Sequence, residues 1–250
     1  MNVQVYTILH YGADYLPYAL RSVYNHVDQL HIIYTPTPSH GTMTDAVAPD
    51  SRDELLATAY AYNPDHKINW YDTFHIRQEG PQRDMAVDIC KQHGDDMVLV
   101  VDCDEVWSAD TLQKALDYAW QQNSARNWLI NFTHFWRSFD YVCKDNNWPV
   151  RIIDLRHDDK SVGYIPAELG DIYHFGYATT DEILRYKISI HGHKAEFRPG
   201  WYENKWQAWP PAEDCHPTND NNWWMPQPFD KTKLPGLMRQ HPFYEMDRIE

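Results

Sequence analysis

The stretch that decides the fold is Met97-Val-Leu-Val-Val-Asp102-Cys103-Asp104-Glu105, in which five apolar residues lead into three carboxylates within four positions. Such a run is typical of a strand buried on both faces of a parallel sheet. In open α/β sheets the ligand binds outside the carboxyl ends of these strands. Carboxylate oxygens suit Mg²⁺ or Mn²⁺, which keep positions open for substrate phosphates. We therefore expect a divalent metal and a diphosphate here; the alternative is an acidic turn before a helix capped by Ser108.

Length and composition indicate a globular chain with a sizeable core. The chain has 250 residues, 43% of them hydrophobic, and no run approaches the ~20 apolar residues of a membrane span. Four cysteines without a paired CxxC spacing predict reduced thiols in a cytoplasmic protein rather than structural zinc. The formal net charge of −14 disfavours a polyanionic partner.

The order of predicted elements divides the chain into three parts, 1–123, 124–195 and 196–250. In the first part we expect strands at 3–9, 29–34 and 67–71, and helices at 14–25 and 51–62. This alternation predicts a parallel sheet with right-handed crossovers. In the second part, longer strands at 128–136 and 150–155 predict a mixed sheet. In the third part the periodicity fades, and Pro, Trp and Asn dominate.

Residues 78–120 resemble a known family. A helix containing Arg83 leads into the apolar strand, the strand ends in Asp-x-Asp-Glu, and a second helix follows. This arrangement resembles the nucleotide-sugar domain of GT-A glycosyltransferases of the family 2 type, although Asp84 replaces the usual Asn and Cys103 the usual Ala. The resemblance implies a GT-A fold, with a mostly parallel sheet flanked by helices. It also implies a nucleotide-sugar-binding half before residue 124 and an acceptor half after it.

The resemblance implies a nucleotide-sugar donor, with UDP-sugars first, and a role for several residues around it. Tyr11 is expected to stack on the base, and Asp72 to read a uracil edge. Arg83 is expected to pair with the diphosphate, because a guanidinium matches its geometry. Asp104 would hold Mn²⁺ or Mg²⁺, and Asp102 would contact the ribose or the metal. These residues also have structural alternatives. Tyr11 could be an aromatic that covers the sheet edge, and Arg83 could form a surface ion pair.

Residues 151–191 resemble, more loosely, the second half of lipopolysaccharide-type family 2 transferases. Arg151 matches the strand arginine, Glu168 the glutamate and His174 the histidine, whereas Ala167 stands where the family has the histidine of a His-Glu pair. The match implies inverting transfer to a hydroxyl of a glycan or another acceptor, which needs a carboxylate to accept the proton. Our candidates for this base are Glu168 first, then Asp140 and Asp171.

Two further side chains complete the expected site. His174 is expected to join Asp104 in the metal shell, since neutral imidazole suits Mn²⁺. His191 is the alternative ligand, and a hydrogen-bonded core histidine is the structural alternative for His174. Lys187 is expected to steady the departing diphosphate, as cationic clamps do, unless it is an exposed helix lysine.

Three other functions are compatible with parts of the sequence. A two-metal nucleotidyltransferase also places aspartates at a strand end, but it needs a basic or glycine-rich loop after the first strand, which residues 10–15 do not supply. A sugar-binding module would explain the C-terminal aromatics, which include Trp201, Trp206, Trp209, Trp223 and Trp224. The same rings suit a lid or a dimer contact. A nucleic-acid acceptor is conceivable because basic residues cluster mid-chain, at Arg137, Lys144, Arg151, Arg156 and Lys160.

Overall fold

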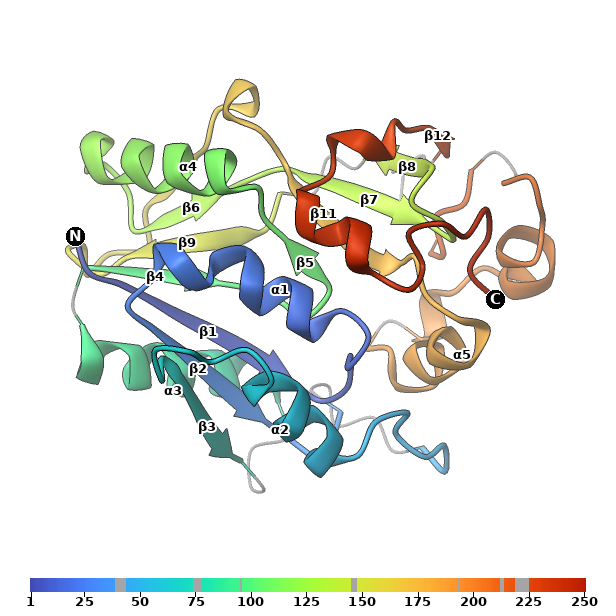
Figure 1. Ribbon diagram of the computed structural model, residues 1–250, viewed down its shortest axis with the longest axis horizontal. Helices are drawn as coiled ribbons and strands as arrows, with labels where there is room; N and C mark the ends of the chain where they lie inside the picture. The colour runs from blue at the N-terminus through green and yellow to red at the C-terminus, as the bar shows by residue number, and fades with distance from the viewer. Residues whose placement is uncertain are drawn as a thin grey trace.

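The computed structural model describes residues 1–38, 44–73, 78–94, 96–144, 148–192, 194–211, 214–218 and 225–250. These residues form two sheets, and Figure 1 shows helices on both faces of the larger one. The expected fold class is confirmed, since a mostly parallel α/β sheet flanked by helices is followed by a mixed sheet. Among the described helices, no segment has the length and apolar character that crossing a bilayer requires.

The larger sheet has seven strands in the order β10-β6-β9-β4-β1-β2-β3. They are β1 (Val3–Leu9), β2 (Gln29–Tyr34), β3 (Ile68–Asp72), β4 (Met97–Val100), β6 (Asn127–Leu129), β9 (Val150–Asp154) and β10 (Val162–Tyr164). Strands β1 to β4 run parallel, and β9 is antiparallel to both β4 and β6. Tyr6 of β1 pairs with Val100 of β4, so the residues that follow these two strands meet at one edge of the sheet.

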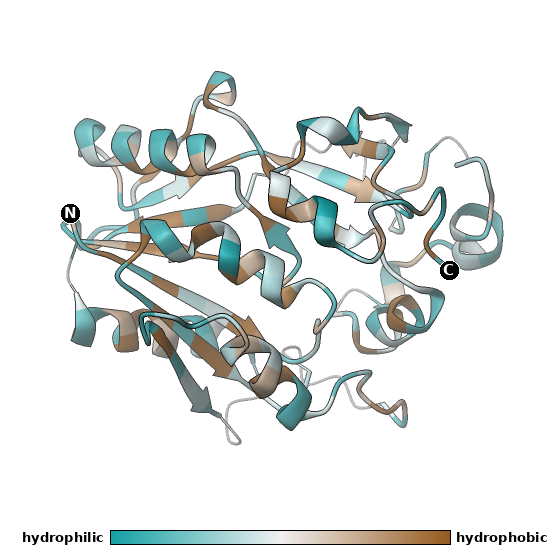
Figure 2. Cartoon of the chain, in the orientation of Figure 1, coloured by the Kyte–Doolittle hydropathy of each residue, from teal (hydrophilic) through white to brown (hydrophobic). Residues whose placement is uncertain are grey.

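Side chains of the central strands alternate between two apolar layers, as the pleat of a strand requires. On one face, Val5 and Leu99 pack beneath α1 (Leu16–Val23), α2 (Arg52–Tyr60) and α4 (Ala109–Gln122). On the other face, Tyr6 and Val100 pack against α3 (Glu79–His93). Figure 2 shows the hydrophobic residues concentrated in these central strands and hydrophilic residues on much of the helix surface. The core therefore fixes the direction of β4, and with it the position of the loop that follows.

Helix starts follow the capping chemistry of short polar side chains. Ser108 Oγ accepts a hydrogen bond from the Thr111 amide at 3.0 Å, which confirms the expected N-cap of α4. Thr180 caps α5 (Asp181–Ile190) in the same way, by accepting from the Ile183 amide at 3.4 Å. Each cap satisfies an amide that the helix itself leaves without a partner.

The single strand expected at 128–136 is wrong, because the chain changes sheets within it. Strand β6 ends at Leu129 and β7 (Phe132–Trp136) begins in the smaller sheet. At the break, the Ile130 amide donates to the Pro149 carbonyl at 3.2 Å. The sequence does not reveal this change of partner, because Asn131 and Thr133 alternate with apolar residues as they would in one continuous strand.

The smaller sheet has the order β12-β8-β7-β11-β5. Its strands are β5 (Glu105–Val106), β7, β8 (Tyr141–Lys144), β11 (Ile172–Tyr177) and β12 (Gln227–Pro228). The C-terminal segment packs on this sheet. Trp201 and Trp206 are 2% and 0% exposed and lie in a cluster with Trp136 and Tyr177. These two tryptophans are core residues rather than a sugar platform or a lid, whereas Trp223 and Trp224 lie outside the described residues.

Candidate functional site

The loop after β4 brings the two sheets together. The Glu105 amide donates to the Asp102 carbonyl at 3.0 Å, which turns the chain directly after the strand. Residue Glu105 then pairs with His174 as β5 joins β11 in antiparallel register. In addition, the Phe175 amide donates to the Asp104 carbonyl at 2.8 Å. The aspartates at the sheet edge and the histidine of β11 are therefore held together by backbone pairing.

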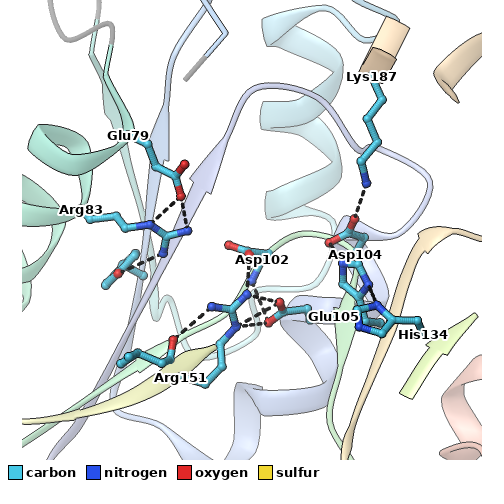
Figure 3. Close-up of polar contacts among 11 residues, drawn as sticks. Glu79, Arg83, Asp102, Asp104, Glu105, His134, Arg151 and Lys187 are labelled. Atoms are coloured by element: carbon cyan, nitrogen blue, oxygen red, sulfur yellow. Dashed lines mark hydrogen bonds and ion pairs between the residues drawn. The ribbon is translucent and has the colours of Figure 1, made fainter. Parts of the chain in front are cut away.

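Asp104 lies between an imidazole and an ammonium group. Its Oδ1 is 3.7 Å from His174 Nε2, and its Oδ2 is 3.9 Å from Lys187 Nζ. Burial raises the pKa of Asp104, and the nearby Lys187 opposes this rise. Figure 3 shows Lys187 reaching down to Asp104 from α5. The structure thus brings together three residues that the sequence predicted for one site.

Gly176 makes room for this convergence. A Cβ added to it would lie 2.6 Å from His174 Cε1, 2.8 Å from Lys187 Nζ and 2.9 Å from Asp104 Oδ2. Real Cβ atoms essentially never approach other atoms this closely. The side chains of Asp104, His174 and Lys187 therefore surround the one position on β11 that carries no side chain.

A second histidine supports His174. His134 Nδ1 and His174 Nδ1 are 2.7 Å apart, so one ring donates a hydrogen bond to the other. The Phe132 ring stacks on His174 with centroids 5.0 Å apart. Burial, followed by the positive charges of Lys187 and Arg151, lowers the pKa of His174 to about 3. The imidazole is therefore neutral at physiological pH, and it presents Nε2 to Asp104 in a fixed orientation.

The carboxylate of Asp102 pairs with Arg151, whereas that of Asp104 faces His174 and Lys187. Arg151 Nη2 lies 2.6 Å from Asp102 Oδ2, and Arg151 Nε donates to both oxygens of Glu105 at 3.0 and 2.9 Å. Burial opposes ionisation of Asp102, but Arg151 and Arg83 hold its pKa below the ordinary value. Figure 3 shows the guanidinium of Arg151 bridging the two carboxylates. Asp102 is thus kept ionised at the sheet edge, and Arg151 fixes its orientation.

A cavity of about 180 Å³ opens above Asp104, between the turn after β1 and α5. Its lining includes His10, Tyr11, Asp14 and Lys187. The imidazole of His10 bridges the Thr35 carbonyl at 2.8 Å and the Tyr186 hydroxyl at 2.6 Å. Tyr11 packs edge-on against Tyr186 with centroids 5.4 Å apart. The expected base-stacking residue therefore shares a cavity with Asp104 and Lys187.

Cys103, which stands where the family usually has Ala, packs beneath the turn after β1. Its Sγ lies 3.3 Å from the Tyr11 carbonyl oxygen. A Cβ on Gly12 would come within 2.4 Å of this sulfur, and the φ of Gly12 is +122°. Both the close approach and the backbone conformation therefore require glycine at this turn.

The other expected donor-binding residues lie at the same edge of the sheet but hold partners of their own. Arg83 forms an ion pair with Glu79 at 2.6 Å and contacts the Tyr6 hydroxyl at 3.4 Å. Asp72 accepts two hydrogen bonds of 2.7 Å from Arg52. A uracil would have to compete with that exposed pair, so the role of Asp72 stays a prediction.

The candidate bases lie on three different segments. Glu168 is exposed on the 3-10 helix Ala167–Leu169 that precedes β11. Asp171 accepts from Asn131 Nδ2 at 3.0 Å and Thr133 Oγ1 at 2.9 Å, while Asp140 lies 3.2 Å from Lys231 Nζ. Asp171 and Asp140 thus already have partners, and Glu168 remains the first candidate.

The alternative metal ligand His191 lies one helical turn beyond Lys187, at the C-cap of α5. Its ring packs edge-on against Phe197 with centroids 5.0 Å apart. His174, in contrast, faces Asp104 directly. The geometry therefore favours His174 over His191 as the partner of Asp104.

The residues around Asp104 fit a divalent ion held by few protein ligands. Two ligands that each lie ~2.1 Å from one ion can be at most about 4 Å apart, and Asp104 Oδ1 and His174 Nε2 are 3.7 Å apart. No group of three or more His, Cys, Asp or Glu side chains forms a metal cage in the part of the chain that the structure describes. A pair of ligands is nevertheless sufficient for Mg²⁺ or Mn²⁺, which retain waters and bind substrate phosphates.

Sequence reasoning missed His134, His10, Asp14 and Gly176. A signal for His134 exists, because His134-Phe135 and His174-Phe175 repeat the same dipeptide on two strands. These strands pair in parallel with the two histidines in register. In contrast, no pattern in the sequence indicates that Gly176 faces three polar side chains.

Comparisons with known proteins give only a partial likeness. No protein-family model matches the chain, and no curated protein matches it. The chain superposes on the crystal structures of S. aureus TarS and S. aureus TarS 1-349, each with a TM-score of 0.41, at 14% and 13% identity. Each superposition covers 76% of this chain, which spans 39% and 64% of those two chains respectively. A superposition of this quality carries no functional conclusion.

Proposed function

We propose that this protein is a metal-dependent glycosyltransferase. It would move a sugar from a nucleoside diphosphate donor to an acceptor hydroxyl, with the inversion that the family resemblance implies. The observation that carries the proposal is the convergence of Asp104, His174 and Lys187 around Gly176 at the carboxyl end of β4. Open α/β sheets bind their ligands at this edge.

In this proposal, Asp104 and His174 bind the metal, and Lys187 supplies a further positive charge. Asp104 and His174 would hold Mn²⁺ or Mg²⁺, and this ion when bound would supply positive charge that neutralises the leaving diphosphate. Lys187 adds a second positive charge beside the same group. His134 orients His174 through the 2.7 Å hydrogen bond, so that Nε2 faces the site.

The donor lies across the carboxyl ends of β1 and β4. Tyr11 borders the cavity that contains Asp104 and is placed to stack on the base. Asp102, whose position Arg151 fixes, is placed to accept a hydrogen bond from a ribose hydroxyl. Arg83, whose side chain is 32% exposed, would bind the diphosphate once Glu79 releases it. UDP-sugars are the first donors to test, as the family resemblance implies.

The test is a donor-hydrolysis panel with the full chain, Mn²⁺ or Mg²⁺, and UDP-, GDP-, CMP- and dTDP-sugars. Nucleotide release is expected with one donor class, and chelation of the metal should abolish it. Asp104→Asn should lose this activity, whereas Asp110→Asn, on the exposed face of α4, serves as the matched control. If every donor stays intact, or if chelation leaves the release unchanged, the proposal is wrong.

A further inference from the structure

A second and larger cavity, of about 710 Å³, lies between α3 and strands β6 and β9. This is within the size range of small-molecule binding sites. Its side chains differ in kind from those around Asp104. The lining carries five cationic residues, Arg83, Lys91, Arg126, Arg151 and Lys160, and two acidic ones, Asp84 and Asp88. This excess of positive charge lies in a chain whose net charge is −14.

The cations lie at the two ends of the cavity. Arg83 and Arg151 are near the carboxyl end of β4, whereas Lys91 is eight residues further along α3. At a rise of 1.5 Å per residue, Arg83 and Lys91 are about 12 Å apart along the helix axis. Arg126 lies at the amino end of β4, because the Asp154 amide donates to its carbonyl at 2.7 Å and Asp154 pairs with Met97. Lys160 is next to it, since the Arg126 amide donates to Ser161 Oγ at 2.9 Å.

Between these ends the cavity is lined by carbon. Tyr6, Val100 and Ile153 are 2%, 1% and 8% exposed and also border the cavity, together with Val87 and Val150. The wall therefore suits the body of an organic molecule. At the near end Arg151 already pairs with Asp102 and Glu105, so the cation that an anionic group can reach there is Arg83, whose ion pair with Glu79 is partly exposed.

At the far end, two cations are available to a ligand. Lys160 is exposed and has no hydrogen bond or ion pair with any residue that the structure describes. The ammonium of Lys91 is 3.8 Å from Asp88, on an exposed surface where such a pair contributes little. A phosphate group placed here would form charge-assisted hydrogen bonds that these lysines do not form within the chain.

The basic residues that the sequence places mid-chain lie in different surroundings where the structure describes them. Arg151 and Lys160 border the cavity. Arg137 is fully buried against Trp206, and Arg156 pairs with Asp154. The side chain of Lys144 lies outside the described residues. Two of these five residues therefore contribute to the cavity.

We infer that the cavity between α3 and β9 is a second ligand site, and that it binds an organic phosphate with anionic groups at both ends of a carbon body. The site is distinct from the cavity above Asp104, with which it shares no lining residue. Arg83 borders this cavity and is also the residue that we assign to the donor diphosphate, so a ligand here and a donor would share that side chain. The inference rests on the charges and the carbon lining of this cavity, and its test needs no glycosyl transfer.

The test uses fructose 1,6-bisphosphate as the probe in calorimetry with the full chain, and fructose 6-phosphate and inorganic phosphate as weaker matched probes. The bisphosphate should bind more tightly than either, because it alone reaches both ends. Replacing both far lysines, in Lys91→Ala with Lys160→Ala, should weaken its binding by about tenfold or more. Asp88→Asn should strengthen binding, since it removes a carboxylate from the lining.

Two control variants establish whether the probe binds in this cavity. Lys114→Ala removes one exposed lysine from α4 on the opposite face of the sheet, and it should leave binding unchanged. Asp104→Asn should also leave it unchanged. Loss of binding in Asp104→Asn would place the probe at the other cavity and overturn the inference. Equal binding of the bisphosphate and the monophosphate, or no effect of the double lysine variant, would overturn it as well.

Discussion

Lys187 Nζ lies 3.9 Å from Asp104 Oδ2 while it donates a 3.0 Å hydrogen bond to the Gly176 carbonyl. The ammonium therefore sits beside the carboxylate to which we assign the metal. It also stands 4.9 Å from the Tyr177 ring centroid, a further contact that holds it in place. Two positive charges next to one carboxylate repel each other, so Lys187 should oppose metal binding while it assists the departing diphosphate.

This relationship predicts opposite effects of one substitution. Lys187→Met removes the charge but keeps most of the volume, so Mn²⁺ should bind more tightly, by about tenfold or more at this separation. Donor turnover should nevertheless fall, because the diphosphate loses a cation. Calorimetry with Mn²⁺ and the rate of nucleotide release measure the two effects. Lys187→Arg, which keeps the charge, is the control, and weaker metal binding in Lys187→Met would contradict the assignment.

Gly176→Ala is expected to disrupt the site without unfolding the sheet. The added methyl would lie 2.6 to 2.9 Å from atoms of His174, Lys187 and Asp104, so at least one of them must move. Overpacking of this kind costs about 1–3 kcal/mol, and metal affinity should fall together with activity. Gly80→Ala, where nothing lies within 4 Å of the added carbon, is the matched control. Unchanged metal binding in Gly176→Ala would place the metal elsewhere.

Arg151 should be required for stability as well as for the site. It is 6% exposed, and its guanidinium pairs with Glu105, which is 0% exposed. Burial already raises the pKa of Glu105 to about 8, and Arg151 is the cation that opposes this rise. Removing one partner of a buried ion pair costs about 3–5 kcal/mol. Arg151→Met should therefore lower the free energy of unfolding by that amount in urea titrations. Adding Glu105→Gln should recover part of the loss, since the unpaired carboxylate is then absent.

Sequence patterns identified the parts of the fold that the apolar core dictates. Strands β1 and β2 match the ranges 3–9 and 29–34 because their buried runs end at polar residues. The loop at Asp102 and Asp104 was likewise predictable, since carboxylates cannot extend a buried strand without partners. The break at residues 130–131 was not, because a single polar residue, Asn131, also fits the alternation of one continuous strand, whereas here the backbone partner changes from β9 to β11.

The family resemblance linked Asp104, His174 and Lys187 across three segments, but the contacts that support Asp102 were not predictable. The pairing of Arg151 with Asp102 and Glu105 joins residues 49 and 46 positions apart, and no periodicity links them. The expected sugar platform of C-terminal tryptophans is wrong at Trp206, again because of a contact between distant residues. A Trp beside polar residues suits a sugar platform, but Trp206 donates its Nε1–H to Asp181 Oδ1 at 2.8 Å and is buried. A distant hydrogen-bond partner thus allowed a polar-looking segment to enter the core.

The stability of the protein should decrease as the pH falls below about 6.5. His31 is fully buried, its Nε2 lies 2.9 Å from Gln4 Oε1, and burial followed by the nearby His93 lowers its pKa to about 4. Between the unfolded pKa of about 6.5 and the folded value, only the unfolded state takes up a proton. Stability is therefore complete above pH 6.5 and is lost towards pH 4, by up to about 1.4 kcal/mol per pH unit for this group.

Urea titrations between pH 7 and pH 4.5 measure this slope. His31→Gln removes the titrating ring and should reduce the slope. His66→Asn is the control, because His66 is exposed and its φ of +54° tolerates asparagine. An unchanged slope in His31→Gln would show that this ring is protonated in the folded protein.

The last prediction concerns the base, and it compares two carboxylates. Glu168 matches the glutamate of the family, but it is exposed on the 3-10 helix before β11. Asp14 has no counterpart in the resemblance, yet it borders the cavity that contains Asp104 and Lys187. Each can be made neutral with little change of shape, by Glu168→Gln and by Asp14→Asn. Loss of a general base lowers the rate of transfer by about 10²-fold or more, while donor binding at Asp104 should stay intact.

We expect Glu168→Gln to show this loss in transfer to an acceptor and to keep donor affinity in calorimetry. For Glu168 to meet an acceptor hydroxyl, the acceptor must lie on the β11 side of the site, because this glutamate precedes that strand by only a few residues. If Glu168→Gln keeps its activity and Asp14→Asn loses it, the acceptor instead enters over the turn after β1. The base would then be a residue that the cavity identifies and the family resemblance does not.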